Sequence, residues 1–169
     1  ADAIASVGGI PVMLDLNPDR VEQLAVELNM HYGVDAAGYA VDITREAEIE
    51  ANTQKLLERF GKIDGLVNNA ANNPKVENQD GKNFSRLENF PLEVWNADVV
   101  VGLTGAFLCA KHYGTAISMN PYGGVILNIS SDLGLIAPDQ RLYRQPGLPE
   151  DQQPVKPVAY SVVKTGLIG

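Results

Sequence analysis

The alternation of short apolar runs with amphipathic stretches constrains the fold of this chain more than any other feature. The apolar runs lie at residues 11–15, 37–41, 63–68 and 125–130, and each has the length of a strand. Amphipathic stretches separate the first three runs, and a long helical pattern at residues 92–119 precedes the fourth. Strands that are apolar throughout and alternate with helices are typical of βαβ units, in which a parallel sheet is covered on both faces. We therefore predict a doubly wound α/β fold.

Local signals mark the ends of the predicted helices. Asn17 can cap the helix after the first strand, with Pro18 at the first helical position. Thr44 can cap the helix that follows the second strand, and Gly61 marks the end of that helix. These signals agree with the order of elements that the apolar runs predict.

The chain looks like a piece of a larger domain. Residues 1–7 have the pattern of the back half of a helix, with no strand and no Gly-x-x-x-Gly-x-Gly loop before them. Gly169 stands five residues after Lys164, inside the last predicted helix. We expect residues 1–169 to form a single domain whose sheet is incomplete at both ends.

The composition limits the classes of partner. A net charge of −8 argues against a general affinity for nucleic acid or for an anionic membrane. We expect no apolar run of transmembrane length. The single cysteine, Cys109, excludes an internal disulfide and fits a reducing compartment, so we expect a cytoplasmic protein. His31 and His112 lack the spacing of a metal site, and no metal is predicted.

Each predicted strand ends in a short segment that contains polar residues. These segments are Asp15, Asp42-Ile43, Asn68 to Ala71, and Ser130-Ser131. In open α/β sheets, ligands bind outside the carboxyl ends of the strands. Each of these residues could instead be an ordinary turn residue, since Asn, Asp and Ser favour turns.

Tyr160 and Lys164 are the most informative pair in the chain. Their spacing of four residues places a phenol and an ammonium on one face of a helix. A neighbouring ammonium favours the phenolate, which suits a tyrosine to proton transfer near neutral pH. Such a pair also arises by chance, so its meaning depends on its context.

The context is that of a known family. The motifs that carry the resemblance are, in chain order, Asp15, Asp42-Ile43, Asn68-Asn69-Ala70-Ala71, Ile129-Ser130-Ser131 and Tyr160-x-x-x-Lys164. Their order and setting over essentially the whole chain resemble the short-chain dehydrogenase/reductase family, in its single-domain branch. The resemblance implies a Rossmann-type sheet that binds NAD or NADP.

The resemblance also implies roles for three residues. Tyr160 would be the general acid/base that exchanges a proton with the substrate oxygen. Lys164 would activate Tyr160 and bind the nicotinamide ribose, and Ser131 would hold the substrate hydroxyl or carbonyl. The hydride would belong to the cofactor, while the protein supplies position and electrostatics.

The cofactor choice is expected to depend on Asp15. A carboxylate at this strand end would accept hydrogen bonds from the adenosine ribose and repel a 2′-phosphate, so NAD is favoured over NADP. By the same resemblance, Asp42 and Ile43 would lie along the adenine. Asn68 and Ala70 would lie against the adenosine ribose.

Two departures from the family pattern stand out. The family usually has an asparagine where this chain has Gly102, and that asparagine belongs to a proton relay. The segment 132–157, an insert of unusual length, precedes Tyr160 and is rich in proline. Long loops in compact domains are often functional. We expect this insert to form a wall or lid over the substrate, with Arg141 or Arg144 meeting an acidic or polyhydroxylated substrate.

The resulting expectation is an NAD-dependent enzyme that interconverts a secondary alcohol and a ketone. The substrate would be a small molecule, with a sugar-related compound or a hydroxy acid as examples, and the family implies a homodimer or homotetramer. Two alternatives stay open: a nucleotide-binding protein of the same fold with weak or no catalysis, and an NADP-dependent carbonyl reductase.

Overall fold

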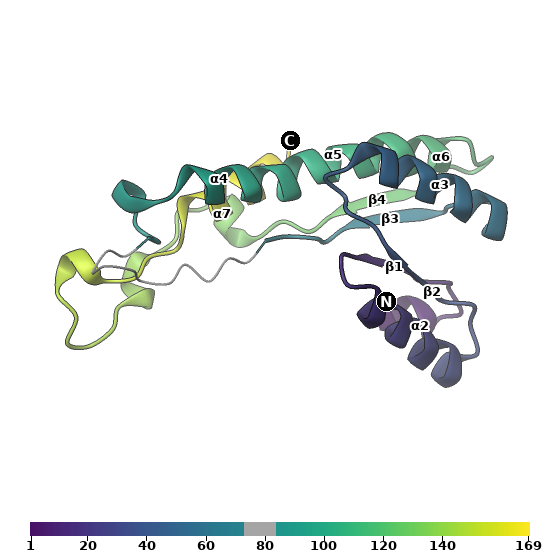
Figure 1. Ribbon diagram of the computed structural model, residues 1–169, viewed down its shortest axis with the longest axis horizontal. Helices are drawn as coiled ribbons and strands as arrows, with labels where there is room; N and C mark the ends of the chain where they lie inside the picture. Colours follow the sequence, from purple (N-terminus) through teal and green to yellow (C-terminus); the bar gives the residue numbers. More distant parts are fainter. Residues whose placement is uncertain (73–83) are drawn as a thin grey trace. The chain divides into compact units, whose positions relative to one another are not determined.

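The computed structural model describes residues 1–72 and 84–169 (Figure 1). The chain divides into two compact units, Ala1–Ile63 and Asp64–Gly169. Each unit contains a pair of parallel strands flanked by helices, and each is described by itself.

The first unit follows the order that the sequence predicts. Its elements are α1 (Asp2–Ala5), β1 (Val12–Asp15), α2 (Pro18–Tyr32), β2 (Ala37–Ala40) and α3 (Glu46–Phe60). β1 and β2 are parallel, with Val12 opposite Ala37 and Asp15 opposite Ala40. The core between α1, α2 and the strands is built from small and medium side chains, with Ala5, Ala25, Leu28 and Ala36 fully buried.

The predicted start of α2 is confirmed, and the structure also shows how the helix ends. The Asn17 side chain accepts a hydrogen bond from the Arg20 backbone N–H at 3.2 Å, which satisfies one of the free donors of the first turn. Pro18 occupies the first helical position, where a missing N–H has no consequence. Gly33 ends the helix with a φ of 66°, a left-handed conformation that favours glycine.

The predicted cap of α3 is wrong, although its predicted end at Gly61 is confirmed. The position before the helix is Arg45, which makes no side-chain cap. Thr44 instead donates its hydroxyl to Asp42 Oδ1 at 2.7 Å, and its backbone N–H donates to the same oxygen at 2.9 Å. The hydroxyl is engaged by a carboxylate two residues earlier, so it does not cap the helix.

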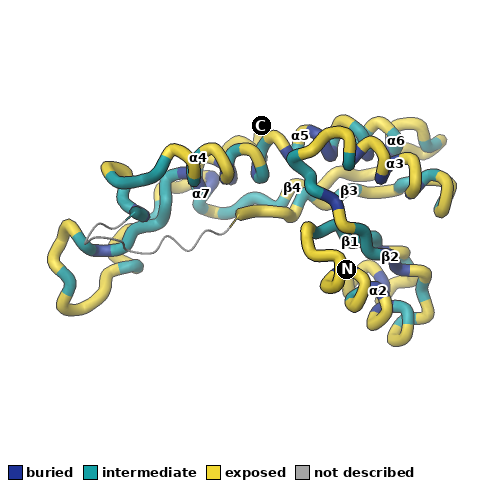
Figure 2. The backbone as a smooth tube through the Cα atoms, viewed as in Figure 1, coloured by how far each residue is buried: buried dark blue, intermediate teal, exposed yellow. Residues whose placement is uncertain are grey.

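The second unit carries the remaining elements. They are β3 (Gly65–Asn68), η1 (Leu87–Asn89), α4 (Leu92–Val99), η2 (Val100–Gly105), α5 (Ala106–Cys109), η3 (Ala110–Gly114), α6 (Thr115–Ser118), β4 (Val125–Asn128), η4 (Asp132–Gly134), η5 (Gln140–Tyr143), η6 (Glu150–Gln152) and α7 (Val158–Gly166). β3 and β4 are parallel, with Gly65 opposite Val125 and Asn68 opposite Asn128. All four residues of β4 are exposed. Figure 2 colours the whole described chain by burial in the view of Figure 1.

The helix Leu92–Ser118 runs without a break because the π-helical turns η2 and η3 join α4, α5 and α6. By length and composition this helix could cross a membrane, so the prediction that no apolar segment reaches such a length is wrong. Core helices of soluble proteins have the same length and composition. This helix buries Leu108, Tyr113 and Ile117 and packs against both β3 and α7.

The predicted α/β class with parallel strands is confirmed. The parallel arrangement follows from strands that are connected through helices, because such a connection returns the chain to the same end of the sheet. One domain formed by all 169 residues stays a prediction.

Candidate active site

Lys164 is the most strongly held side chain of the predicted site. It lies on α7, is only 7% exposed, and its Nζ donates a hydrogen bond to the Ile129 carbonyl at 2.6 Å. Ile129 directly follows β4. A buried ammonium is tolerated only where polar partners compensate for lost water. The carbonyl end of the strand thus fixes a positive charge at the edge where α/β sheets bind ligands.

Tyr160 lies one turn before Lys164 on α7, as predicted. The centre of its ring is 5.9 Å from Lys164 Nζ. A second ammonium, that of Lys156, stands 3.7 Å from the same ring centre. The sequence reasoning missed Lys156, although its position four residues before Tyr160 repeats the spacing of the predicted pair.

The two serines after β4 have different environments. Ser130 donates its hydroxyl to the Lys164 backbone carbonyl at 2.6 Å, which ties the strand end to α7. Ser131 donates to Asp132 Oδ1 at 2.8 Å and accepts from the Leu133 backbone N–H at 3.2 Å. Ser131 therefore begins η4, which packs against α7. Ser130 holds the two elements together, while Ser131 bonds only within its own turn.

Asn68 also joins elements that are distant in sequence. Its Nδ2 donates to Asn128 Oδ1 at 2.8 Å, and Asn128 Nδ2 donates to the Leu167 carbonyl at 3.3 Å. These two amides link the ends of β3 and β4 to the end of α7. Ala70 is exposed just beyond β3. Contact of Asn68 and Ala70 with a cofactor stays a prediction.

Gly102, the first departure from the family pattern, has a clear packing reason. A Cβ at this buried position would lie 2.3 Å from Val163 Cγ1. Real Cβ atoms essentially never approach another atom so closely, and Val163 is itself buried in α7. Any side chain at position 102 would therefore have to displace the Val163 side chain. An asparagine at this position would meet the same atoms.

Asp98 is a second polar residue that the sequence reasoning missed. It is buried on α4, and burial raises the pKa of its carboxyl, although a hydrogen bond from Asn72 acts in the opposite direction. Its Oδ1 has no hydrogen-bond partner in the described part of the chain. The signal was present in the sequence, since Asp98 interrupts an otherwise apolar helical stretch.

Three of the predicted adenosine-binding residues, Asp15, Asp42 and Ile43, belong to the first unit, whereas Asn68 and Ala70 belong to the second. Asp15 ends β1, and its Oδ1 accepts from the Asn17 backbone N–H at 3.0 Å. Asp42 follows β2, and hydrogen bonds from the Thr44 hydroxyl and N–H lower the pKa of its carboxyl. The Val41 N–H donates to the Asp15 carbonyl at 3.1 Å, so the two strand ends are adjacent. Ile43 is half-buried beside them.

The insert, residues 132–157, is organised around the side-chain amide of Gln153. This buried amide accepts from the Gln145 N–H at 2.8 Å and donates to the carbonyls of Gln145 and Leu148 at 3.1 and 2.7 Å. Three hydrogen bonds from one side chain close the outer part of the insert into a loop. These bonds stiffen the outer part of the insert, while its role as a wall or lid over the substrate stays a prediction.

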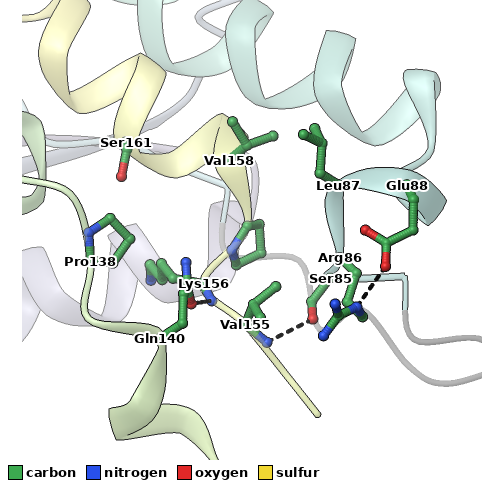
Figure 3. A pocket seen from close by; sticks show the side chains of 11 residues that line it. Ser85, Arg86, Leu87, Glu88, Pro138, Gln140, Val155, Lys156, Val158 and Ser161 are labelled. Carbon is green, nitrogen blue, oxygen red and sulfur yellow. Dashed lines mark hydrogen bonds and ion pairs between the residues drawn. The ribbon is translucent and has the colours of Figure 1, made fainter. Parts of the chain in front are cut away.

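The insert forms one wall of a cavity of about 320 Å³ at the beginning of α7 (Figure 3). The lining comes from the segment before α4, the insert and α7. These residues are Ser85, Arg86, Leu87 and Glu88 before α4, Pro138, Gln140, Val155, Lys156 and Pro157 in the insert, and Val158 and Ser161 in α7. Figure 3 shows the Ser161 hydroxyl on the side of α7 that faces Pro138. That oxygen is buried without a hydrogen-bond partner among the described residues.

The two arginines that were predicted to meet a substrate are paired within the insert. Arg141 donates from Nε and Nη2 to the Asp139 carboxylate, at 2.9 and 2.7 Å. Arg144 Nη2 donates to both carboxylate oxygens of Glu150 at 2.7 Å. A contact with a substrate stays a prediction, and it would have to compete with these ion pairs.

Within the second unit the structure brings Tyr160, Lys164 and the Ser131 turn to one end of β4, through α7 and η4. Within the first unit it brings Asp15 and Asp42 to the ends of adjacent strands. In residues 1–72 and 84–169, no group of three or more His, Cys, Asp or Glu side chains could hold a metal ion.

Comparisons with known proteins identify the family and the fold. A family model described as short chain dehydrogenase matches residues 1–142. D-threitol dehydrogenase of Mycolicibacterium smegmatis is 28% identical over 169 residues, which are 100% of this chain and 55% of that protein. The chain spans about half the length of the curated relatives it matches.

Two solved structures illustrate the likeness of fold. NAD⁺-bound xylitol dehydrogenase matches with a TM-score of 0.78 and 23% identity, over 99% of this chain and 54% of that one. NADPH-dependent 3-quinuclidinone reductase from Rhodotorula rubra matches with a TM-score of 0.74 and 20% identity, over the same shares. With the family model covering most of its length, the chain belongs to the short-chain dehydrogenase family.

Proposed function

We propose that this chain carries the reaction centre of an NAD-dependent dehydrogenase that interconverts a secondary alcohol and a ketone. The observation that carries the proposal is the pair Tyr160 and Lys164 on one face of α7, with the buried Lys164 ammonium bonded to the Ile129 carbonyl. A fixed positive charge near a phenol favours the phenolate, the form that accepts a proton from an alcohol.

The proposed steps assign one task to each residue. The nicotinamide, when bound, accepts or donates the hydride. In the direction of alcohol oxidation, Tyr160 as phenolate takes the proton of the substrate hydroxyl. The positive charge of the Lys164 ammonium stabilises that phenolate. Ser131 exchanges its hydrogen bond to Asp132 for one to the substrate oxygen, and thereby orients the reacting carbon.

The preference for NAD rests on Asp15. One of its oxygens accepts a hydrogen bond from the Asn17 N–H, and the other accepts none from the described part of the chain. A carboxylate at this strand end suits the two hydroxyls of an adenosine ribose and repels a 2′-phosphate. Asp42 and Ile43 would then border the adenine, and Asn68 and Ala70 the ribose. Of the two solved structures with a similar fold, the xylitol dehydrogenase is NAD⁺-bound and the 3-quinuclidinone reductase is NADPH-dependent. The fold alone therefore does not choose between the cofactors.

The proposed substrate is a small polyhydroxylated alcohol or its ketone. The cavity of about 320 Å³ beside the start of α7 offers both apolar walls and polar groups, including Gln140, Lys156 and Ser161. Two of the similar proteins, D-threitol dehydrogenase and xylitol dehydrogenase, are named for sugar alcohols. We further propose a cytoplasmic homodimer or homotetramer, as the family resemblance implies.

The test is the Tyr160→Phe variant of the full-length protein, assayed with NAD and a panel of sugar alcohols. We expect kcat to fall by about 10²–10⁴-fold, because general acid–base catalysis contributes that much. NAD affinity, measured by fluorescence titration, should change by less than about twofold, because the substitution removes only the phenolic hydroxyl from the surroundings of the cofactor.

The matched control is Tyr122→Phe, since the Tyr122 side chain is fully exposed and should not affect turnover. Near-normal turnover of Tyr160→Phe would exclude the proposed role of Tyr160. NAD binding without turnover in the unaltered protein would favour the alternative of a nucleotide-binding protein. Glycine at position 102 does not favour that alternative, since its close approach to Val163 is a packing reason for the residue.

A further inference from the structure

The end of the insert places a second cation on the ring of the proposed catalytic tyrosine. Lys156 Nζ lies 3.7 Å from the centre of the Tyr160 ring, closer than Lys164 Nζ at 5.9 Å. A lysine within about 6 Å of an aromatic ring centre is attracted by the ring's negative face. Both ammonium groups therefore act on one phenol.

Lys156 differs from the other cations of this region. The guanidinium groups of Arg86, Arg141 and Arg144 each pair with a carboxylate at 2.7 Å. Lys156 has no ion pair with any carboxylate in the described part of the chain, where its side-chain contact is the Tyr160 ring. Its charge is thus left to act on the ring.

The insert holds Lys156 in this position. The Lys156 N–H donates to Gln140 Oε1 at 2.8 Å, and the N–H of the preceding residue, Val155, donates to Ser85 Oγ at 3.0 Å. Pro157 follows, and its fixed φ limits the freedom of the chain between Lys156 and the first turn of α7. The insert and the segment before α4 therefore set the place of the ammonium.

We propose that Lys156 is a positioning residue that favours the phenolate of Tyr160 and fixes the tilt of its ring. This inference rests on the proposed function of Tyr160. The cation stabilises negative charge on the ring and its oxygen more than it stabilises the neutral phenol. The insert therefore tunes the reacting group as well as lining the cavity.

The elements that pack against α7 carry further charged residues, which could also act on Tyr160. Lys164 lies on α7 itself, η4 carries Asp132, α4 carries Glu93 and Asp98, and η2 carries no charged residue. The two lysines are the groups whose ammonium nitrogens have a defined approach to the Tyr160 ring. Among residues 1–72 and 84–169, removing Lys156 leaves Lys164 as the one cation at the ring.

The experiment measures kcat for alcohol oxidation against pH in the full-length protein. Lys156→Met keeps an unbranched apolar stem and removes the charge. We expect the midpoint of the rising limb to move up by about 0.5–1 pH unit, with the rate recovering above that midpoint. Lys156→Arg should keep the original midpoint within about 0.2 unit, because a guanidinium also interacts with a ring face. Lys55→Met, at an exposed position of α3, is the control for loss of a surface charge.

Two results would overturn the inference. One is a loss of rate by the same factor at every pH, which is the effect of a merely structural role. The other is an unchanged midpoint with a raised KM for acidic substrates, which would make Lys156 a substrate contact. Neither result touches the role of Tyr160, which depends on the separate Tyr160→Phe assay.

Discussion

The two units place polar residues at equivalent points, the carboxyl ends of parallel strands, but bind them in different ways. In the first unit, Asp15 and Asp42 accept hydrogen bonds from residues only two positions away, Asn17 and Thr44. In the second unit, Asn68 bonds a residue 60 positions away and Lys164 bonds one 35 positions away. Local bonds fix a single turn, while distant bonds fix strands and helix against each other.

This difference corresponds to two kinds of task. A carboxylate held by its own turn keeps acceptor capacity for a ligand, and it can be changed without loosening the fold. Groups that take part in a reaction must keep their geometry within a fraction of an ångström, which requires support from rigid elements. We therefore expect substitutions at Asp15 to affect binding alone. Substitutions around α7 should affect stability and turnover.

Apart from Tyr160→Phe, the largest effect is expected from Asp15→Asn. The amide keeps an oxygen for the Asn17 N–H but loses the charge that favours ribose hydroxyls and repels a phosphate. A hydrogen bond to a charged group contributes about 1.5–3 kcal/mol, so KM for NAD should rise by about tenfold or more. The preference for NAD over NADP should shrink while kcat stays within about twofold. Steady-state kinetics with both cofactors measure this.

Asp19→Asn is the matched control, since Asp19 is an exposed acid in the first turn of α2. A collapse of kcat in Asp15→Asn, or an equal loss for both cofactors, would break the division between a binding unit and a reacting unit.

The next effect concerns the contact between the long helix and α7. Gly102→Ala gains about 1 kcal/mol of helix propensity, but its Cβ meets Val163 Cγ1 at 2.3 Å. Overpacking costs about 1–3 kcal/mol, so the clash should outweigh the gain and the free energy of unfolding should fall. Urea titration followed by circular dichroism measures the change.

The double variant Gly102→Ala/Val163→Ala tests the cause. Removing both Val163 γ carbons removes the atoms that clash, so adding Gly102→Ala to Val163→Ala should be neutral or stabilising. An equal loss in both backgrounds would show that Val163 is not the reason for glycine at this position.

The smallest effect is expected from Asp98→Asn. Burial raises the pKa of the Asp98 carboxyl, so the fold penalises its charged form. The contribution of this group to stability is present in full below the pKa of the unfolded chain and is lost as pH rises through the raised folded pKa. At pH 7 the variant should be more stable by up to about 1 kcal/mol, and this advantage should vanish below about pH 4.

Thermal unfolding at the two pH values measures this effect, with Glu93→Gln as a control at an exposed position of the same helix. An advantage of Asp98→Asn that is the same at both pH values would contradict the ionisation argument.

The sequence predicted features whose causes are local. Asn17, Pro18 and Gly61 act through their own turns, and the apolar runs act through periodicity, so strands and helices fell close to their predicted places. Thr44 shows the limit of such reasoning. Its hydroxyl had two local uses, and the geometry of the turn after β2 selected the bond to Asp42.

Contacts between distant segments could not be predicted in the same way. Nothing in a pattern indicates that Gly102 lies against Val163, or that the Ser130 hydroxyl is taken by the Lys164 carbonyl. The family resemblance supplied Tyr160, Lys164 and Ser131, and it supplied no role for Lys156. That residue became a candidate only when the path of the insert placed its ammonium on the Tyr160 ring.

The amide of Gln153 has a consequence for how such a protein can diversify. Because this one side chain closes the segment from Gln145 to Gln153, the loop tip around Gly147 is joined to the rest of the insert at a fixed base. Changes in the length or sequence of the tip leave that base, and the lysine three residues beyond it, in place. The sequence of the tip can therefore vary during evolution while the residues proposed to transfer the proton keep their positions.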